Sequence, residues 1–370
     1  MELEVVSGAV IACRLFDIAD AVDLAKAEFL WSRLPRPAGT RGRLVFTPPK
    51  AVAFGVAPLD IPLEPVSVQL EGREFQLEAS VRLYDFGVAR LALRLAADDL
   101  PWSEFTGRVV AFGVLIASDD ATIWLPLLER LRETFGPALA GPSRSSLDED
   151  YLMAFVRGFN ETPTADELLS RIDLVPLLSG ETRPLSESAR RDLLRQRFSY
   201  YTDDLVVLTW DRAFIYEPRG DSDVMDVLDV ANAQFLEMRY YDQLLDAELP
   251  RMYDLVEAMQ RTRPLLSSRR YADLARRLYG LVAEVTELRE KVDNALQVTE
   301  DVYLARIYTA ALDLFRVAAV SAAVDHKLAI IRDTYAALYE EASSRRAALM
   351  EAAIVLLIVA EIVLALLHRG

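Results

Sequence analysis

Three aspartates bracket one short hairpin and are the first residues whose types and spacing could do chemistry. Asp203 and Asp204 precede the apolar run Leu205–Thr209, and Asp211 lies in the turn that follows it. Carboxylates bind divalent cations and act as general acids or bases. Aspartate is also a common turn residue, because its side chain bonds nearby backbone amides. A carboxylate-based enzyme or ligand sensor and a simple turn are therefore both open, and we assign no metal ion here.

A second polar group lies about 30 residues further on. Glu237 and Tyr241 are four residues apart, and Arg239 and Asp242 are three apart, so each pair can meet on a helix surface. Asp242 occupies a position where apolar residues recur, and we expect it to pair with Arg239 or with Arg306 of a facing helix. A buried ion pair that sets helix register is the favoured interpretation. A ligand pocket near this group is the alternative.

Other enzyme signatures are missing from the sequence. The histidines, His326 and His368, have no second histidine or cysteine at metal-ligand spacing, which argues against zinc sites and catalytic triads. Neither a phosphate-binding loop nor a dinucleotide fingerprint is present. We predict no cofactor, and a non-enzymatic function is favoured.

Composition narrows the classes of partner. The net charge of −16 argues against direct nucleic-acid binding, which is built from clustered lysine and arginine. Cys13 is the single cysteine, so no intrachain disulfide can form and a reducing compartment is expected. The chain opens without a basic and apolar signal segment.

Hydrophobic periodicity predicts an α+β fold, with an N-terminal mixed α/β domain over residues 1–140 and a second α/β segment over 151–217. Alternating runs separated by glycine predict a β-meander over residues 66–95, and a closing hairpin is predicted at 205–216. The runs AVAFGV after Lys50 and VVAFGV after Arg108, both interpreted as short strands, resemble each other. Duplication of a small α+β unit is one hypothesis, and chance similarity between short apolar strands is the alternative.

After Gly220 the pattern becomes helical, and we expect a long antiparallel coiled-coil stalk over residues 221–346. Apolar residues recur at heptad spacing in three runs, which cover 224–249, 274–295 and 303–342. Pro250 should kink or end the first helix. The third run continues without proline or glycine, which predicts one helix from about residue 300 to 367. Pairing of the stalk between two chains is the alternative, and we expect a homo-oligomer.

Residues 347–367 form an apolar stretch near the C-terminus. A helix of this length spans roughly 31 Å, which is enough to cross a hydrocarbon core of about 30 Å. The stretch holds Glu351 and Glu361 as candidate intramembrane carboxylates, which are costly unless protonated, paired or hydrated. We expect a single transmembrane anchor with the lipid bilayer as a partner, and a buried helix is the alternative. The expected location is the cell inner membrane, with the bulk of the chain cytoplasmic.

Several segments, taken in order, resemble one protein family. They are YYTDDLVVLTWD at 200–211, DVLDVANAQFLEMRYYDQLLD at 226–246, YLARIY at 303–308, DHKL at 325–328, and Arg345-Arg346 before the apolar helix. Together these are similar to the "required for meiotic nuclear division" family, a domain of unknown function in bacteria, fungi and mitochondria. The resemblance implies a membrane-attached protein without established enzymatic activity. It also suggests a tethered scaffold or assembly factor that supports translation or complex assembly at the membrane through an unidentified protein partner.

Overall fold

The structure is a computed structural model that falls into two compact units. Unit 1 comprises residues 1–240 and 291–318, and unit 2 comprises residues 241–290 and 319–370. The structure describes residues 3–34, 52–53, 56–118, 120–143, 147–181, 183–220, 223–260, 273, 276, 278–280, 282–283, 285–286, 297–298 and 301–367. An α+β fold is confirmed, with strands concentrated in the N-terminal part of the chain and helices in the C-terminal part.

The core of unit 1 is a sheet of ten described strands. The main path runs in the order β11, β12, β13, β10, β1, β7, β6 and β4, while β5 pairs with β6 and β8 with β1. The strands are β1 Glu4–Asp17, β4 Leu59–Pro62, β5 Val66–Leu70, β6 Arg73–Leu83, β7 Val88–Ala96, β8 Leu100–Pro101, β10 Asp148–Phe159, β11 Gln196–Phe198, β12 Leu205–Leu208 and β13 Arg212–Tyr216.

The meander and the closing hairpin lie where their alternating apolar runs predict them. Strands β5, β6 and β7 pair in sequence, and β12 pairs with β13 across a short turn. The predicted division between residues 1–140 and 151–217 is wrong, however, because β10 pairs antiparallel with β1 and parallel with β13. One sheet therefore crosses the expected linker, since a strand can pair with partners far away in the sequence.

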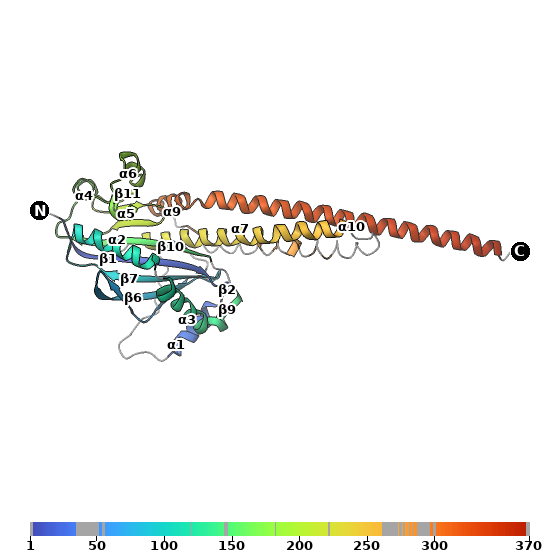
Figure 1. Cartoon of the computed structure of the whole chain (residues 1–370), viewed down its shortest axis with the longest axis horizontal. Coiled ribbons are helices and arrows are strands. Elements are labelled where there is room, and N and C mark those ends of the chain that lie inside the picture. Colours follow the sequence, from blue (N-terminus) through green and yellow to red (C-terminus); the bar gives the residue numbers. More distant parts are fainter. Residues whose placement is uncertain are drawn as a thin grey trace. The chain divides into compact units, whose positions relative to one another are not determined.

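One face of this sheet is covered by α2, Trp102–Ser118 (Figure 1). The helix buries Phe105, Val109 and Phe112 in the same core as Val10 and Ala12 of β1. Sequence reasoning missed this helix and treated 109–114 as a strand because the run is short and apolar. In the run matched to it, the structure describes only Val52–Ala53 as β structure, strand β3, and the rest of that run lies outside the described residues. The duplication therefore stays a hypothesis.

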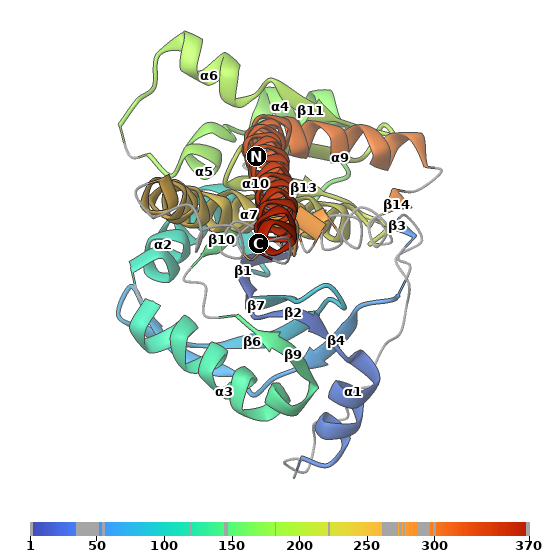
Figure 2. The same cartoon turned by 90° about the vertical axis from the view of Figure 1, so that its right-hand side faces the viewer.

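Smaller elements complete unit 1. Helix α1, Leu24–Ser32, packs against α3, Leu125–Phe135, and the two lie together below the sheet in Figure 2. A π-helical turn at Asp120–Trp124 precedes α3, and a 3₁₀ turn at Gly136–Ala138 follows it. Outside the main sheet, β2, Ala19–Val22, pairs with β9, Leu139–Pro142, and β3 pairs with β14, Gln297–Val298. The remaining short helices are α4 Ala165–Arg171, α5 Val175–Ser179 and α6 Glu187–Leu193.

The long helices differ from their predicted limits. Helix α7, Val224–Gln260, continues through Pro250 and does not end there. The single helix expected from about residue 300 is divided into α9, Val302–Leu314, and α10, Val317–Leu367. Arg316 between them has a φ of 58°, a left-handed conformation that interrupts helical hydrogen bonding. Most of the second heptad run, 274–295, lies outside the described residues.

Within unit 2, α10 buries Val324, Leu328, Ile331 and Leu338, a subset of the predicted heptad positions. This spacing of four, three and seven residues keeps one stripe of the helix covered. Among the helices of described residues, no single helix is long and apolar enough to cross a membrane. Two bent pairs of consecutive helices reach the required length and apolar composition only when the two helices of a pair are taken together: Trp102–Ser118 with Thr122–Ala138, and Val302–Leu314 with Val317–Glu341.

Candidate functional site

The hairpin aspartates take separate local roles. Asp204 is buried and accepts hydrogen bonds from the backbone N–H groups of Tyr200 at 2.7 Å and Tyr201 at 3.1 Å. At the other end of β12, Asp211 accepts from the Thr209 hydroxyl at 3.2 Å and lies 3.4 Å from Arg212 Nε. Burial raises the pKa of Asp211. These contacts are those of carboxylates that hold turns, and strand β12 lies between the two groups.

Asp203 remains half-buried beside the same hairpin. Burial, with a further contribution from the Asp203 charge, raises the pKa of Tyr216 to about 12. Among the described residues, no group of three or more histidine, cysteine, aspartate or glutamate side chains has an arrangement that could hold a metal ion.

Two of the predicted polar residues of α7, Arg239 and Asp242, have separate partners. Glu237 and Tyr241 are buried. Arg239 forms an ion pair with Glu149 at the start of β10 and stacks over the Phe235 ring with a centroid distance of 5.8 Å. In unit 2, Asp242 pairs with Lys327 of α10 at 2.7 Å, so the expected arginine partner is wrong.

The remaining predicted residues, Glu351 and Glu361, are exposed on α10. Apolar side chains surround them along the helix, and none of the described ion pairs includes either carboxylate.

The most elaborate polar arrangement in unit 1 was not predicted, and it lies on the face of the sheet opposite α2. Strand pairing places Asp60, Arg82 and Arg90 in one row across β4, β6 and β7. Two residues further along each strand, Ser80 and Ala92 form the next row with Cys13 of β1. A third row holds Glu78, Arg94, Ile11 and Met153. Long side chains therefore stand on both sides of a strip of small ones.

The first row meets the beginning of α7. Arg82 forms a two-point contact with Asp60, with Nε to Oδ1 at 2.8 Å and Nη2 to Oδ2 at 3.0 Å, and it also pairs with Asp226. Arg90 Nη2 lies 2.6 Å from Asp229 Oδ2. The Asp229 side chain is only 2 % exposed, and burial raises its pKa despite the two arginines. Both side chains are largely buried, so each charge is stabilised mainly by the other.

Cys13 lies in the strip of small side chains and is also buried. Loss of hydration, together with the nearby Asp229 carboxylate, raises the pKa of the Cys13 thiol to about 12. The neutral thiol is therefore the form present near pH 7, and it is a weak nucleophile.

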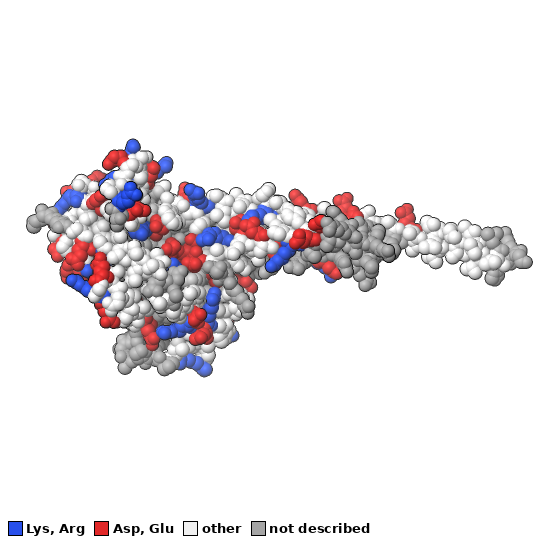
Figure 3. Space-filling model, viewed as in Figure 1, with Lys and Arg blue, Asp and Glu red and all other residues white. Residues whose placement is uncertain are grey.

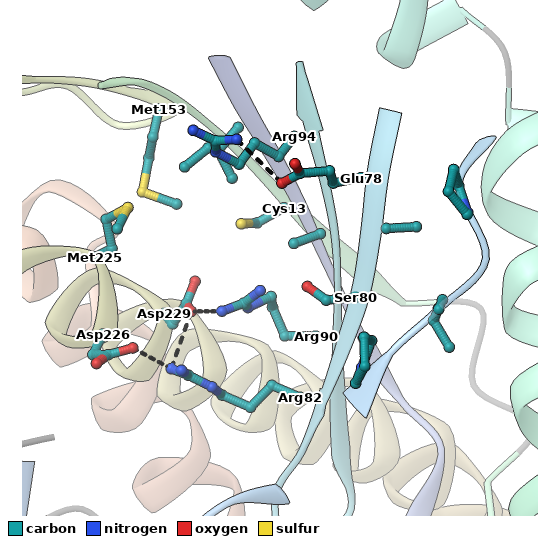
Figure 4. A pocket seen from close by; sticks show the side chains of 16 residues that line it. Cys13, Glu78, Ser80, Arg82, Arg90, Arg94, Met153, Met225, Asp226 and Asp229 are labelled. Atoms are coloured by element: carbon teal, nitrogen blue, oxygen red, sulfur yellow. Dashed lines mark hydrogen bonds and ion pairs between the residues drawn. The ribbon is translucent and has the colours of Figure 1, made fainter. Parts of the chain in front are cut away.

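The rows and α7 line a cavity of about 480 Å³ that is open to solvent (Figure 4). Ser80, Ala92 and Cys13 form its floor, Met225, Asp226 and Asp229 come from α7, and Pro62, Leu63 and Pro65 form one side. In Figure 4 the arginines at 82 and 90 extend from the sheet toward the two aspartates of α7. A cavity of this size is comparable to pockets that hold small organic molecules.

The sequence carries a partial signal of this site. In β6 and β7, polar residues alternate with apolar ones, which identifies one polar face per strand. Such alternation is typical of a solvated sheet face. Nothing local indicates that Asp226 and Asp229, about 140 residues away, cover this face and bury its charges.

Comparison with known proteins identifies a family for this α+β unit. The family model described as "Uncharacterized protein MJ0711, N-terminal domain" matches residues 7–223, which is more than half of the chain. The chain belongs to this family. The uncharacterized protein MJ0711 of Methanocaldococcus jannaschii is 25% identical over 249 residues, which cover 65% of this chain and 74% of that protein. No solved structure matches the chain.

Proposed function

We propose that this protein is a membrane-tethered scaffold or assembly factor, in which residues 347–367 of α10 insert into a bilayer and unit 1 is the protein-binding part. One observation supports the tether above all others. Every side chain that the structure describes between residues 350 and 364 of α10 is exposed, although most of them are apolar.

Helix geometry gives this exposure its meaning. Successive residues of an α-helix are rotated by about 100°, so six consecutive positions cover the whole circumference. The six side chains from 354 to 359 are all large and apolar, and each is at least 51 % exposed: Ile354, Val355, Leu356, Leu357, Ile358 and Val359. Figure 3 shows this part of α10 as a largely uncharged surface. The apolar surface therefore surrounds the helix and does not form a stripe.

A surrounding apolar surface favours lipid over a single protein partner. One partner helix covers only the stripe that faces it. Such a stripe is buried on α10 at Val324 and Ile331. Hydrocarbon covers all sides at once. Contiguous apolar patches of this kind are rare on soluble monomers, because water contact is unfavourable.

The two glutamates oppose insertion without preventing it. Glu351 lies near the start of the apolar segment and can reach the interface, whereas Glu361 lies well inside it. A charged residue at mid-helix costs about 2.5–3.5 kcal/mol on insertion scales. The leucine, isoleucine and valine residues of the segment each favour insertion by about 0.3–0.6 kcal/mol. Their summed contribution to the free energy of insertion is larger than the cost of one charged residue at mid-helix.

The scaffold part of the proposal is supported by the exposed surface of unit 1 and by the family resemblance. Exposed aromatic side chains are enriched at protein interfaces, and unit 1 exposes Tyr200 and Trp210 by 64 % and 70 %. Resemblance to the "required for meiotic nuclear division" family adds membrane attachment and support of translation or complex assembly as the expected role. No specific observation favours the alternative of an enzyme or ligand sensor at 203–211, because Asp204 and Asp211 form hydrogen bonds within their own turns.

Membrane fractionation tests the tether. The full chain should stay in the membrane pellet after alkaline extraction, and a variant that ends at Arg346 should become soluble. Leu357→Arg should reduce the pelleted fraction, because arginine at mid-helix is costly to insert. Tyr339→Arg is the matched control, as Tyr339 is exposed on the same helix outside the apolar segment. A shortened variant that still resists alkaline extraction would contradict the proposal.

A further inference from the structure

We propose that the cavity between the sheet and the start of α7 binds a small, uncharged, largely apolar organic molecule that carries one hydrogen-bonding group. This inference is independent of the membrane tether, because every residue that lines the cavity belongs to unit 1.

The shape of the cavity follows from the rows of the sheet. Ser80, Ala92 and Cys13 are short, while the residues two positions away on each strand are long. Asp226 and Asp229 of α7 contact the long side chains of the first row, Arg82 and Arg90, and the space above the short residues is left unfilled. The resulting cavity has a volume of about 480 Å³ and opens to solvent, so a small molecule can enter it.

The charge of the lining determines which molecules can enter. Three arginines and three carboxylates line the cavity, and they are already paired: Arg90 with Asp229, Arg82 with Asp226, and Arg94 with Glu78 at 3.1 Å. Asp60 is an additional partner of Arg82 at the outer end of the row, where its side chain is 36 % exposed and hydrated. A ligand with a net charge would leave one charge uncompensated next to buried groups, which is strongly unfavourable.

The other lining groups indicate the rest of the ligand. Ile11, Pro62, Leu63 and Pro65 present apolar surface, and Met153 and Met225 are flexible side chains that adapt to irregular shapes. The Ser80 hydroxyl can both donate and accept a hydrogen bond. An amide, alcohol or ketone on an aromatic or aliphatic body fits this combination.

Three probes with the same indole ring system test whether the cavity prefers an uncharged ligand. Near pH 7, indole-3-acetamide is neutral, indole-3-acetate is an anion and tryptamine is a cation. Binding to the full chain in detergent micelles can be followed by NMR of ¹³C-methyl methionine. Met153 and Met225 line the cavity, so their methyl signals report on it directly. Met350 lies in the apolar segment of α10 and reports separately on any binding there.

We expect the neutral amide to shift the Met153 and Met225 signals in a saturable way, with a Kd at least about tenfold lower than that of either charged probe. Ala92→Leu, which fills the floor, should abolish these shifts. Asp229→Asn removes the charge that neutralises Arg90, so it should reverse the ranking in favour of indole-3-acetate. Glu161→Gln is the matched control with little effect, because Glu161 pairs with Arg171 outside the cavity and its side chain is 43 % exposed.

Each possible result either supports or overturns binding of a neutral ligand in this cavity. Equal binding of the three probes, shifts confined to Met350, no shift at all, or full binding by Ala92→Leu would each overturn the proposal. The signals of Met238 and Met252, which are buried elsewhere in α7, show whether a variant keeps its fold. If Asp229→Asn fails that check, the ranking of probes on the unmodified chain and on Ala92→Leu decides the question.

Discussion

Arg90 of β7 and Asp229 of α7 lie 2.6 Å apart with side chains that are 12 % and 2 % exposed, so the helix meets the sheet through a buried charge pair. Removal of one partner leaves the other charge buried. Asp229→Ala should therefore reduce the free energy of unfolding by about 3–5 kcal/mol. Urea unfolding in detergent micelles, followed by tryptophan fluorescence, measures this loss.

The double variant Arg90→Met with Asp229→Leu removes both charges and should recover most of the lost stability, because apolar replacements of a buried pair are often neutral. Glu78→Ala at the rim is the control, with an expected loss below about 1 kcal/mol. Equal losses at the rim and in the interior would show that burial does not determine the strength of these pairs.

Lys327 of α10 contacts two carboxylates of α7, Asp242 at 2.7 Å and Asp246 at 2.6 Å. The Asp242 side chain is 30 % exposed, so water screens the pair in part. Asp242→Ala should cost about 1 kcal/mol, and Asp246→Ala should cost less because Asp246 is 61 % exposed. Thermal unfolding of the two variants provides the comparison. A loss above about 3 kcal/mol for Asp242→Ala would indicate a fully buried pair instead.

Asp17 should make the protein less stable as the pH rises from about 4 to 6. Burial raises the pKa of its carboxyl to about 6, although the Ser143 hydroxyl donates a hydrogen bond to it at 2.7 Å. Between the ordinary pKa of 3.8 and this raised value, the folded state binds more protons than the unfolded state, so stability falls with rising pH.

Asp17→Asn keeps an acceptor for Ser143 and removes the ionisation. The variant should be more stable than the parent at pH 8, by about 1–3 kcal/mol, and close to it at pH 4. Urea unfolding at the two pH values measures the difference. An unchanged difference between pH 4 and pH 8 would mean that Asp17 does not titrate in this range.

Gly87 occupies a turn that tolerates no side chain. Its φ is +103°, and a Cβ atom there would lie 1.7 Å from the backbone oxygen of Ala19. Gly87→Ala should therefore cost at least about 3 kcal/mol, because the clash is with backbone that cannot rotate away. Gly72 is the control, since its φ is +77° but its Cβ would meet open space. Gly72→Ala should cost only about 1–2 kcal/mol in the same unfolding assay.

Elements with a clear local pattern could be predicted from the sequence, and elements defined by distant contacts could not. The meander of β5 to β7 and the β12–β13 hairpin have alternating runs and turn residues of their own. Helix α2 carries a short apolar run that also suits a strand, and only its packing on β1 selects the helix. The break at Arg316 has no glycine or proline to announce it.

The same distinction explains the candidate site. Asp203, Asp204 and Asp211 are close together in sequence, which made them candidates for one site. In the structure, Asp204 and Asp211 form hydrogen bonds in separate turns. The charged face around Arg82 and Arg90 is assembled from strands and a helix that are far apart in the chain. Pairs of this kind have no signature within a short window of residues.

The sequence by itself determined the fold class, the polar and apolar faces of the main strands, and the apolar composition of residues 347–367, because each is a property of neighbouring residues and their period. Only the tertiary structure decided that one sheet unites residues 4–216 and that α7 buries the arginines of β6 and β7. It also decided that Lys327 is the partner of Asp242. Strand order and ion-pair choice depend on contacts across more than eighty residues, and side-chain type alone does not select among the partners within reach.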